Sequence, residues 1–231
     1  MLVAAAVCPN PPLMAPELAG EAAPELDGLR DGCGLAIRRL AAARADVLVV
    51  VGGGAATAAY PGEAAGTLAP WGADVRVGAG KPVLPLSATV GGWLLDRAGT
   101  RPSAYQIVAG DAAPRECLAL GAELAGRAPR VALLVMGDGS ARLTVKSPGY
   151  LHPGAEEYDA ALARALAAAD TAALAALDPA EAGELWVGGR AAFQVLAGAA
   201  GDTGAFHGEP LYDEAPYGVG YRVVSWSRGD A

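Results

Sequence analysis

The chain has 231 residues, of which 53% are hydrophobic and 18% charged, a composition that can bury one substantial core and that excludes disordered and fibrous proteins. A formal net charge of -8 and a pI near 4.8 exclude a strongly basic surface for nucleic acid or an anionic membrane, so small molecules or other proteins are the expected partners. Gly, Pro and charged residues interrupt every apolar stretch before it could span a membrane, and residues 1–7 lack the basic start of a signal peptide, so we expect a cytoplasmic protein.

The predicted elements alternate between strand and helix along the chain. Apolar runs predict strands at residues 2–8, 46–51, 105–109 and 131–136, with a short strand at 74–77 and a closing strand at 218–226. Apolar residues at helical spacing, or alanine-rich stretches, predict helices at residues 24–44, 87–97, 114–126, 155–169 and 191–200. This order predicts a single α/β domain over residues 1–231, with a mostly parallel central sheet flanked by helices.

Three of these predicted strands end in short polar or glycine-rich turns. Residues 2–8 are followed by a proline-rich turn, residues 46–51 by three glycines, and residues 131–136 by the turn 137–142. Ligands of open α/β sheets bind at the carboxyl ends of the strands, so we expect the three turns to form one pocket. The candidate pocket residues are Cys8, Asn10, Gly53, Gly54, Asp138, Ser140, Arg142 and Tyr217.

The same turns resemble motifs of the class III extradiol ring-cleavage dioxygenase superfamily. Cys8-Pro9-Asn10-Pro11-Pro12-Leu13 resembles its opening Pro-His-Pro-Pro, with Asn10 at the histidine position. Gly52-Gly53-Gly54 stands where the superfamily carries a second histidine, and residues 137–142 resemble its Gly-x-x-Ser-His turn, with Ala141 or Arg142 at the catalytic histidine. Residues 212–221 are similar to the end of a bacterial branch.

The resemblance implies an iron enzyme whose iron ligands have been replaced here. In the superfamily, ferrous iron held by two histidines and a carboxylate binds a catechol-type substrate and dioxygen, and a further histidine acts as acid and base. The amide of Asn10 is a poor iron ligand, glycine offers no side chain, and Arg142 stays protonated and cannot act as a base. We therefore expect a relative that has lost the iron site, needs no cofactor, and binds a small ligand that could be anionic.

Three other functions stay open. A dioxygenase with altered iron ligands could join His207, Glu209 and Asp213 with His152 in a rebuilt metal site. The structural alternative to such a metal site is that His152 lies in a loop and His207 on an exposed turn, without binding a metal. A scaffold or protein-interaction role is a second alternative. Dinucleotide binding at Gly52-Gly53-Gly54 is a third, although the third glycine of the fingerprint and a full following helix are missing. Homo-oligomers are also open.

The polar candidates each have a structural alternative. The turn with Asp138, Ser140 and Arg142 could present backbone N–H groups and a guanidinium to an anion, or it could be a turn that satisfies its own hydrogen bonds. Cys8 could be a nucleophile if a neighbour lowers its pKa, or a small buried side chain. Tyr217 could hydrogen-bond a ligand or only pack.

Overall fold

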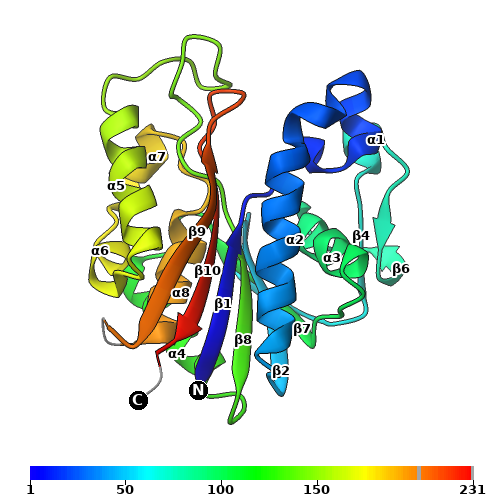
Figure 1. The fold of residues 1–231 in the computed structure, drawn as a ribbon, viewed down its shortest axis with the longest axis vertical. Helices are drawn as coiled ribbons and strands as arrows, with labels where there is room; N and C mark the ends of the chain where they lie inside the picture. Colours follow the sequence, from blue (N-terminus) through cyan, green and yellow to red (C-terminus); the bar gives the residue numbers. More distant parts are fainter. Residues whose placement is uncertain (202–203, 230–231) are drawn as a thin grey trace.

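A seven-stranded sheet forms the centre of the protein in the computed structural model, which describes residues 1–201 and 204–229 (Figure 1). The strand order is β3-β7-β2-β8-β1-β10-β9. The strands are β1 (Leu2–Cys8), β2 (Val47–Gly54), β3 (Ala58–Pro61), β7 (Ala104–Ala109), β8 (Val131–Met136), β9 (Phe206–Glu214) and β10 (Tyr221–Arg228). Strands β7, β2, β8 and β1 are parallel to one another, whereas β3, β10 and β9 run antiparallel to their neighbours. The sheet is therefore mostly parallel, as the sequence predicts.

Helices cover both faces of this sheet. The helices α2 (Asp27–Ala42) and α3 (Leu86–Arg97) pack on one face, and α4 (Pro114–Ala125), α5 (Ala155–Ala167) and α8 (Arg190–Ala200) pack on the other (Figure 1). The short helices α6 (Thr171–Ala175) and α7 (Pro179–Glu184) lie beside α5, and α1 (Pro16–Ala19) follows β1. A small second sheet has the order β5-β4-β6, with β4 at Ala64–Thr67, β5 at Arg76–Val77 and β6 at Ala79–Pro82.

The central strand β8 shows why the core has two halves. All six of its residues are buried, which is typical of a parallel strand covered on both faces. Successive side chains of a strand point to opposite faces, so Leu133 and Val135 join the core under α4, α5 and α8. Leu134 and Met136 join the core under α2 and α3. The continuous apolar run of β8 thus holds two helical layers on one sheet.

Two glycines set the close packing of α4 against α8. A Cβ atom on Gly121 would overlap the carbonyl oxygen of Val195, and one on Gly198 would overlap that of Leu118. Any larger side chain at either position would force the helix backbones apart. These glycines therefore fix α8, whose first turn reaches the carboxyl ends of the central strands.

The predicted elements that carry the core are confirmed, with small changes at their ends. The predicted helix 24–44 begins later, because residues 20–26 form a 3-10 helix before α2. The closing strand predicted at 218–226 is β10, which begins at Tyr221 after a turn. The glycines of β2 are followed by the strand β3 and not by a helix, so the dinucleotide fingerprint lacks the helix N-terminus that it needs.

Both edges of the large sheet are short or polar. Strand β3 has four residues, and β9 carries Pro210 in its middle and His207, Glu209, Asp213 and Glu214 as exposed side chains. Proline cannot donate a hydrogen bond to a further strand, and charges on an edge oppose pairing. Within the described residues, no helix is long and apolar enough to cross a membrane.

Candidate functional site

The carboxyl ends of β1, β2 and β8 meet at one place, as the sequence predicts. The backbone N–H of Gly137 donates to the carbonyl of Cys8 (3.0 Å), and the N–H of Asn10 donates to the Asp138 carboxylate Oδ1 (2.8 Å). On the side of β2, a Cβ on Gly53 would lie 3.4 Å from the carbonyl oxygen of Gly188. We call Asn10, Gly53, Asp138, Gly188 and Gly189 the strand-end cluster.

Two helices begin at this cluster. The N–H of Gly189, directly before α8, donates to the backbone carbonyl of Asp138 (2.8 Å). The hydroxyl of Ser87, in the first turn of α3, donates to the carbonyl of Gly53 (2.7 Å). Neither helix has a side-chain cap at its N-terminus. The positive ends of both helix dipoles therefore lie near the strand ends.

Asp138 is the titratable group of the cluster. Its side chain is half-buried, and burial raises its pKa to about 6, although the hydrogen bond from Asn10 opposes the shift. Burial and the charge of Asp138 also raise the pKa of the buried Tyr221, so this phenol stays protonated at neutral pH. A carboxyl with a pKa near neutrality can exchange a proton with a bound molecule under physiological conditions.

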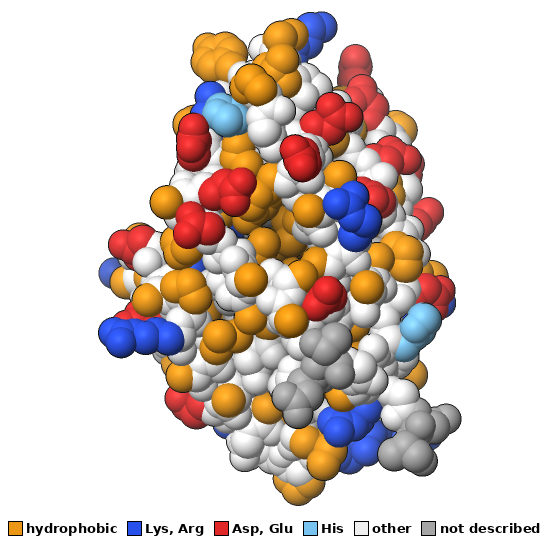
Figure 2. Space-filling model, turned by 90° about the vertical axis from the view of Figure 1, so that its left-hand side faces the viewer, with side chains coloured by type: hydrophobic (Ala, Val, Ile, Leu, Met, Phe, Trp, Pro, Cys, Tyr) orange, Lys and Arg blue, Asp and Glu red, His pale blue; other side chains and the backbone are white. Residues whose placement is uncertain are grey.

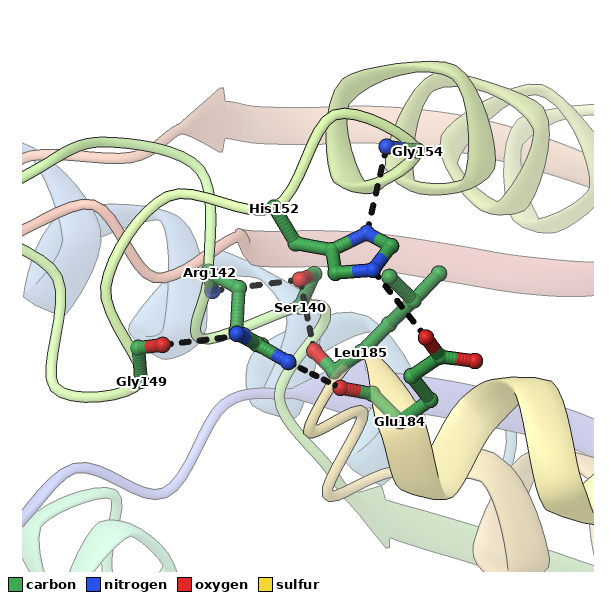
Figure 3. Close-up of polar contacts among 7 residues, drawn as sticks. All are labelled: Ser140, Arg142, Gly149, His152, Gly154, Glu184 and Leu185. Carbon is green, nitrogen blue, oxygen red and sulfur yellow. Dashed lines mark hydrogen bonds and ion pairs between the residues drawn. The ribbon is translucent and has the colours of Figure 1, made fainter.

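The strand-end turn, residues 137–142, uses its polar groups inside the protein. The buried hydroxyl of Ser140 donates to the carbonyl of Leu185 (2.7 Å) and accepts from the N–H of Arg142 (3.2 Å), as Figure 3 shows. The N–H of Ser140 donates to Asp159 Oδ1 (2.8 Å), and Asp159 pairs with Arg222 at 2.5 Å. This geometry agrees with the turn that satisfies its own hydrogen bonds.

The guanidinium of Arg142 is held by two backbone carbonyls. Its Nε donates to Gly149 (2.9 Å) and its Nη1 donates to Glu184 (2.8 Å), so the side chain ties two loops together (Figure 3). Both donors are therefore occupied by backbone carbonyls. Of the two roles that the sequence leaves open for Arg142, the geometry favours the structural one over anion binding.

The other pocket candidates lie around the cluster without opening into it. Cys8 is fully buried, in agreement with a small hydrophobic side chain. Gly54 is packed so closely that a Cβ would lie 2.5 Å from Ile107. The hydroxyl of Tyr217 hydrogen-bonds the carboxylate of Glu25 (3.0 Å). Their pocket role stays a prediction, and the two cavities beside α5 are lined by other residues.

The residues at the strand ends do not fit the iron site that the resemblance implies. Asn10 and Asp138 offer one amide and one carboxylate, whereas the superfamily arrangement needs two imidazoles as well. His152 lies in a loop, where Nδ1 accepts from the N–H of Gly154 (3.2 Å) and Nε2 pairs with Glu184 (3.1 Å) (Figure 3). His207 is exposed on β9, not on a turn. In the described part of the chain, no three His, Cys, Asp or Glu side chains could hold a metal together.

Sequence reasoning missed two groups of residues that support the site. Gly188 and Gly189 precede α8, and their contacts with Gly53 and Asp138 join segments more than 50 residues apart in sequence. The buried pair Asp159–Arg222 supports the strand-end turn, because Asp159 accepts from the N–H of Ser140. In the sequence, Asp159 lies in an alanine-rich helix and Arg222 in an alternating strand, so neither residue stands out as part of a site. Only the interruption of apolar runs by single charges could have indicated this pair.

No family model and no curated protein sequence matches the chain. Among solved structures, it is similar to the crystal structure of uncharacterized protein JW3007 from Escherichia coli K12, with 15% sequence identity and a TM-score of 0.53. The match covers 96% of this chain and 99% of that one. At this identity the likeness shows a shared fold alone.

Proposed function

We propose that the protein is a relative of the class III extradiol dioxygenases that binds a small molecule at the strand-end cluster without a metal ion. The observation that carries this proposal is the half-buried Asp138 carboxyl, with its pKa of about 6, at the meeting point of three strand ends and two helix starts. In open α/β sheets, this is where ligands bind.

The groups at the cluster favour a ligand with a hydroxyl or another hydrogen-bond donor. Oδ1 of Asp138 accepts from Asn10, which leaves lone pairs of the carboxylate for a ligand. The sequence suggests an anionic ligand because of Arg142, but two donors of that guanidinium are bound to Gly149 and Glu184. A phenol or alcohol donating to Asp138 matches the observed donors and acceptors better than a carboxylate does.

Ligand titrations of the full chain, followed by amide chemical shifts, test this proposal. Catechol is the probe, and 1,2-dimethoxybenzene is the control because it has the same ring without donors. We expect catechol to shift the amides of Asn10, Asp138 and Gly189, and the ether to leave them unchanged. Equal shifts with both compounds, or none with catechol, would argue against a donor-binding site here.

Two variants distinguish a specific contribution of Asp138 to catechol binding from a general effect of removing a carboxylate. Asp138→Asn keeps the shape and the acceptor for Asn10 but loses the charge, so we expect catechol affinity to fall about five- to tenfold. Asp111→Asn is the matched control, because Asp111 also follows a strand but is exposed. Unchanged affinity in Asp138→Asn would remove Asp138 from the site.

Metal analysis tests the metal-free part of the proposal independently. The protein is incubated anaerobically with ferrous iron, dialysed, and analysed for iron. We expect no stoichiometric iron to remain, because the strand ends offer too few ligands. One retained iron per chain would instead support a dioxygenase with altered ligands.

A further inference from the structure

A cavity lies between α5, α6 and α7, on the face of the protein that Figure 2 shows. Its volume is about 390 Å³, which is enough for a molecule with one ring and a short chain. Figure 2 shows a hollow with hydrophobic side chains at its floor, acidic side chains above it and to its left, and a basic side chain to its right. We call it the α5–α7 cavity.

The floor of this cavity is apolar because small and branched residues line it. Four alanines leave the space that larger side chains would fill, and two leucines complete the wall. The apolar lining consists of Ala161, Leu162, Ala165, Ala173, Ala176 and Leu177. An apolar surface of this kind favours the ring or alkyl part of a ligand.

The charged groups that line the cavity are all acidic. They are Glu157, Asp178 and Glu181, and no lysine or arginine among the described residues lines it. Asp178 caps α7 by accepting from the N–H groups of Ala180 and Glu181, each at 2.9 Å. Glu157 and Glu181 are exposed, and their carboxylates have no ion-pair partner in the described ranges. Two uncompensated negative charges at the rim favour a cation.

One buried polar atom of a residue that lines the cavity lacks a partner among the described residues. The hydroxyl oxygen of Tyr158 is shielded from solvent and makes no hydrogen bond within the part of the chain that the structure describes. Burial raises the pKa of Tyr158 to about 12, so the hydroxyl is protonated at neutral pH and can both donate and accept. Because this oxygen is shielded from solvent, a ligand in the open cavity does not reach it in this conformation, and the site depends on the apolar floor and the acidic rim.

We propose that the α5–α7 cavity binds a small amphiphilic amine, with its apolar part on the alanine and leucine floor and its ammonium group at the Glu157 and Glu181 carboxylates. This site is separate from the strand-end cluster. The two sites share no lining residue. The α5–α7 cavity selects a ligand by charge and apolar surface, whereas the strand-end cluster selects one through the titratable carboxyl of Asp138.

Calorimetric titration at low salt and pH 7 tests the charge selection. The probe is 2-phenylethylamine, and 3-phenylpropionate is its control because it carries a similar ring and chain with the opposite charge. We expect the amine to bind at least about tenfold more tightly than the acid, because the two unpaired carboxylates attract an ammonium group and repel a carboxylate. Equal affinity for both probes, or no binding of the amine, would overturn the proposal.

A pair of neighbouring variants tests the location. Ala173→Phe places a ring in the cavity, whereas Ala172→Phe changes the preceding residue of α6, which is also exposed but does not line the cavity. We expect Ala173→Phe to weaken amine binding at least about tenfold and Ala172→Phe to leave it unchanged. The same weakening in both variants, or in neither, would place the amine elsewhere.

A second pair keeps the test decisive if Ala173→Phe fails to fold. Glu157→Gln removes a rim charge, and Glu156→Gln removes a charge that lines the neighbouring cavity between α5 and β9. Amine affinity is expected to fall about two- to fivefold in Glu157→Gln and to stay unchanged in Glu156→Gln. An equal effect of both substitutions would show a response to net charge only and would contradict this site.

Discussion

The strand-end turn and the α5–α7 cavity use their polar groups in opposite ways. In the turn, Ser140 and Arg142 make hydrogen bonds inside the protein, and the Asp138 carboxylate of the same turn accepts a hydrogen bond from the N–H of Asn10. At the cavity, the carboxylates of Glu157 and Glu181 form no ion pair among the described residues, and the buried hydroxyl of the lining residue Tyr158 has no partner there either. A turn rich in polar residues can therefore be a rigid structural support. The more open site lies instead between α5, α6 and α7, whose alanine-rich sequences carry no recognisable motif.

The largest loss of stability should come from breaking the Asp159–Arg222 ion pair, which supports the strand-end turn through the N–H of Ser140. Asp159 and Arg222 are 3% and 12% exposed, so Arg222→Met leaves a buried carboxylate without its charged partner. We expect the free energy of unfolding, measured with urea, to fall by about 3–5 kcal/mol. Arg76→Met is the control, since its pair with Asp74 is exposed, and it should change stability by less than about 0.5 kcal/mol. Similar losses in both variants would show that the buried pair does not hold the turn.

The next effect concerns pH and Asp138. A pKa raised from 3.8 to about 6 means that the folded protein binds this proton more tightly than the unfolded chain does. Stability from this group is therefore fully present below pH 4 and is lost as the pH rises through 6, by about 2–3 kcal/mol. Unfolding between pH 4 and 7 should show this loss in the native chain and not in Asp138→Asn. An equal pH dependence in both proteins would show an ordinary pKa for Asp138.

The smallest effect compares two hydroxyl groups directly. Ser140→Ala leaves the carbonyl of Leu185 and the N–H of Arg142 without their partner, so we expect a loss of about 1–3 kcal/mol in urea unfolding. Tyr158→Phe removes a hydroxyl that has no partner among the described residues, and stability should stay unchanged or rise by up to about 1 kcal/mol. If Tyr158→Phe destabilises as much as Ser140→Ala, the Tyr158 hydroxyl has a partner after all.

The sequence predicts the core of the fold because its strands are continuously apolar. The strand at residues 131–136 is found with its correct ends, since every residue is apolar and a polar turn follows. Strand β9 is missed because an edge strand with Pro210 and several charges shows no apolar alternation. Helices α6 and α7 are missed because five or six residues cannot show a helical period.

The candidate site is predictable in location but not in detail. Parallel strand ends must share one edge of the sheet, so the meeting of Asn10 with Asp138 follows from the order of the strands. The partners of Arg142 could not be predicted, because one of them, the carbonyl of Glu184, lies 42 residues away in a separate segment. The α5–α7 cavity likewise depends on the packing of three helices, which no local pattern records.

The two edges of the sheet also affect how the molecules behave when they crowd together. A four-residue strand at one edge, and a strand with a central proline and several charged or titratable side chains at the other, give a neighbouring copy little backbone to pair with. Edge-to-edge growth of the sheet is the usual first step towards fibrils and amorphous aggregates. The proline and charges of β9, which prevent its recognition as a strand from the sequence, thus also oppose aggregation through this edge.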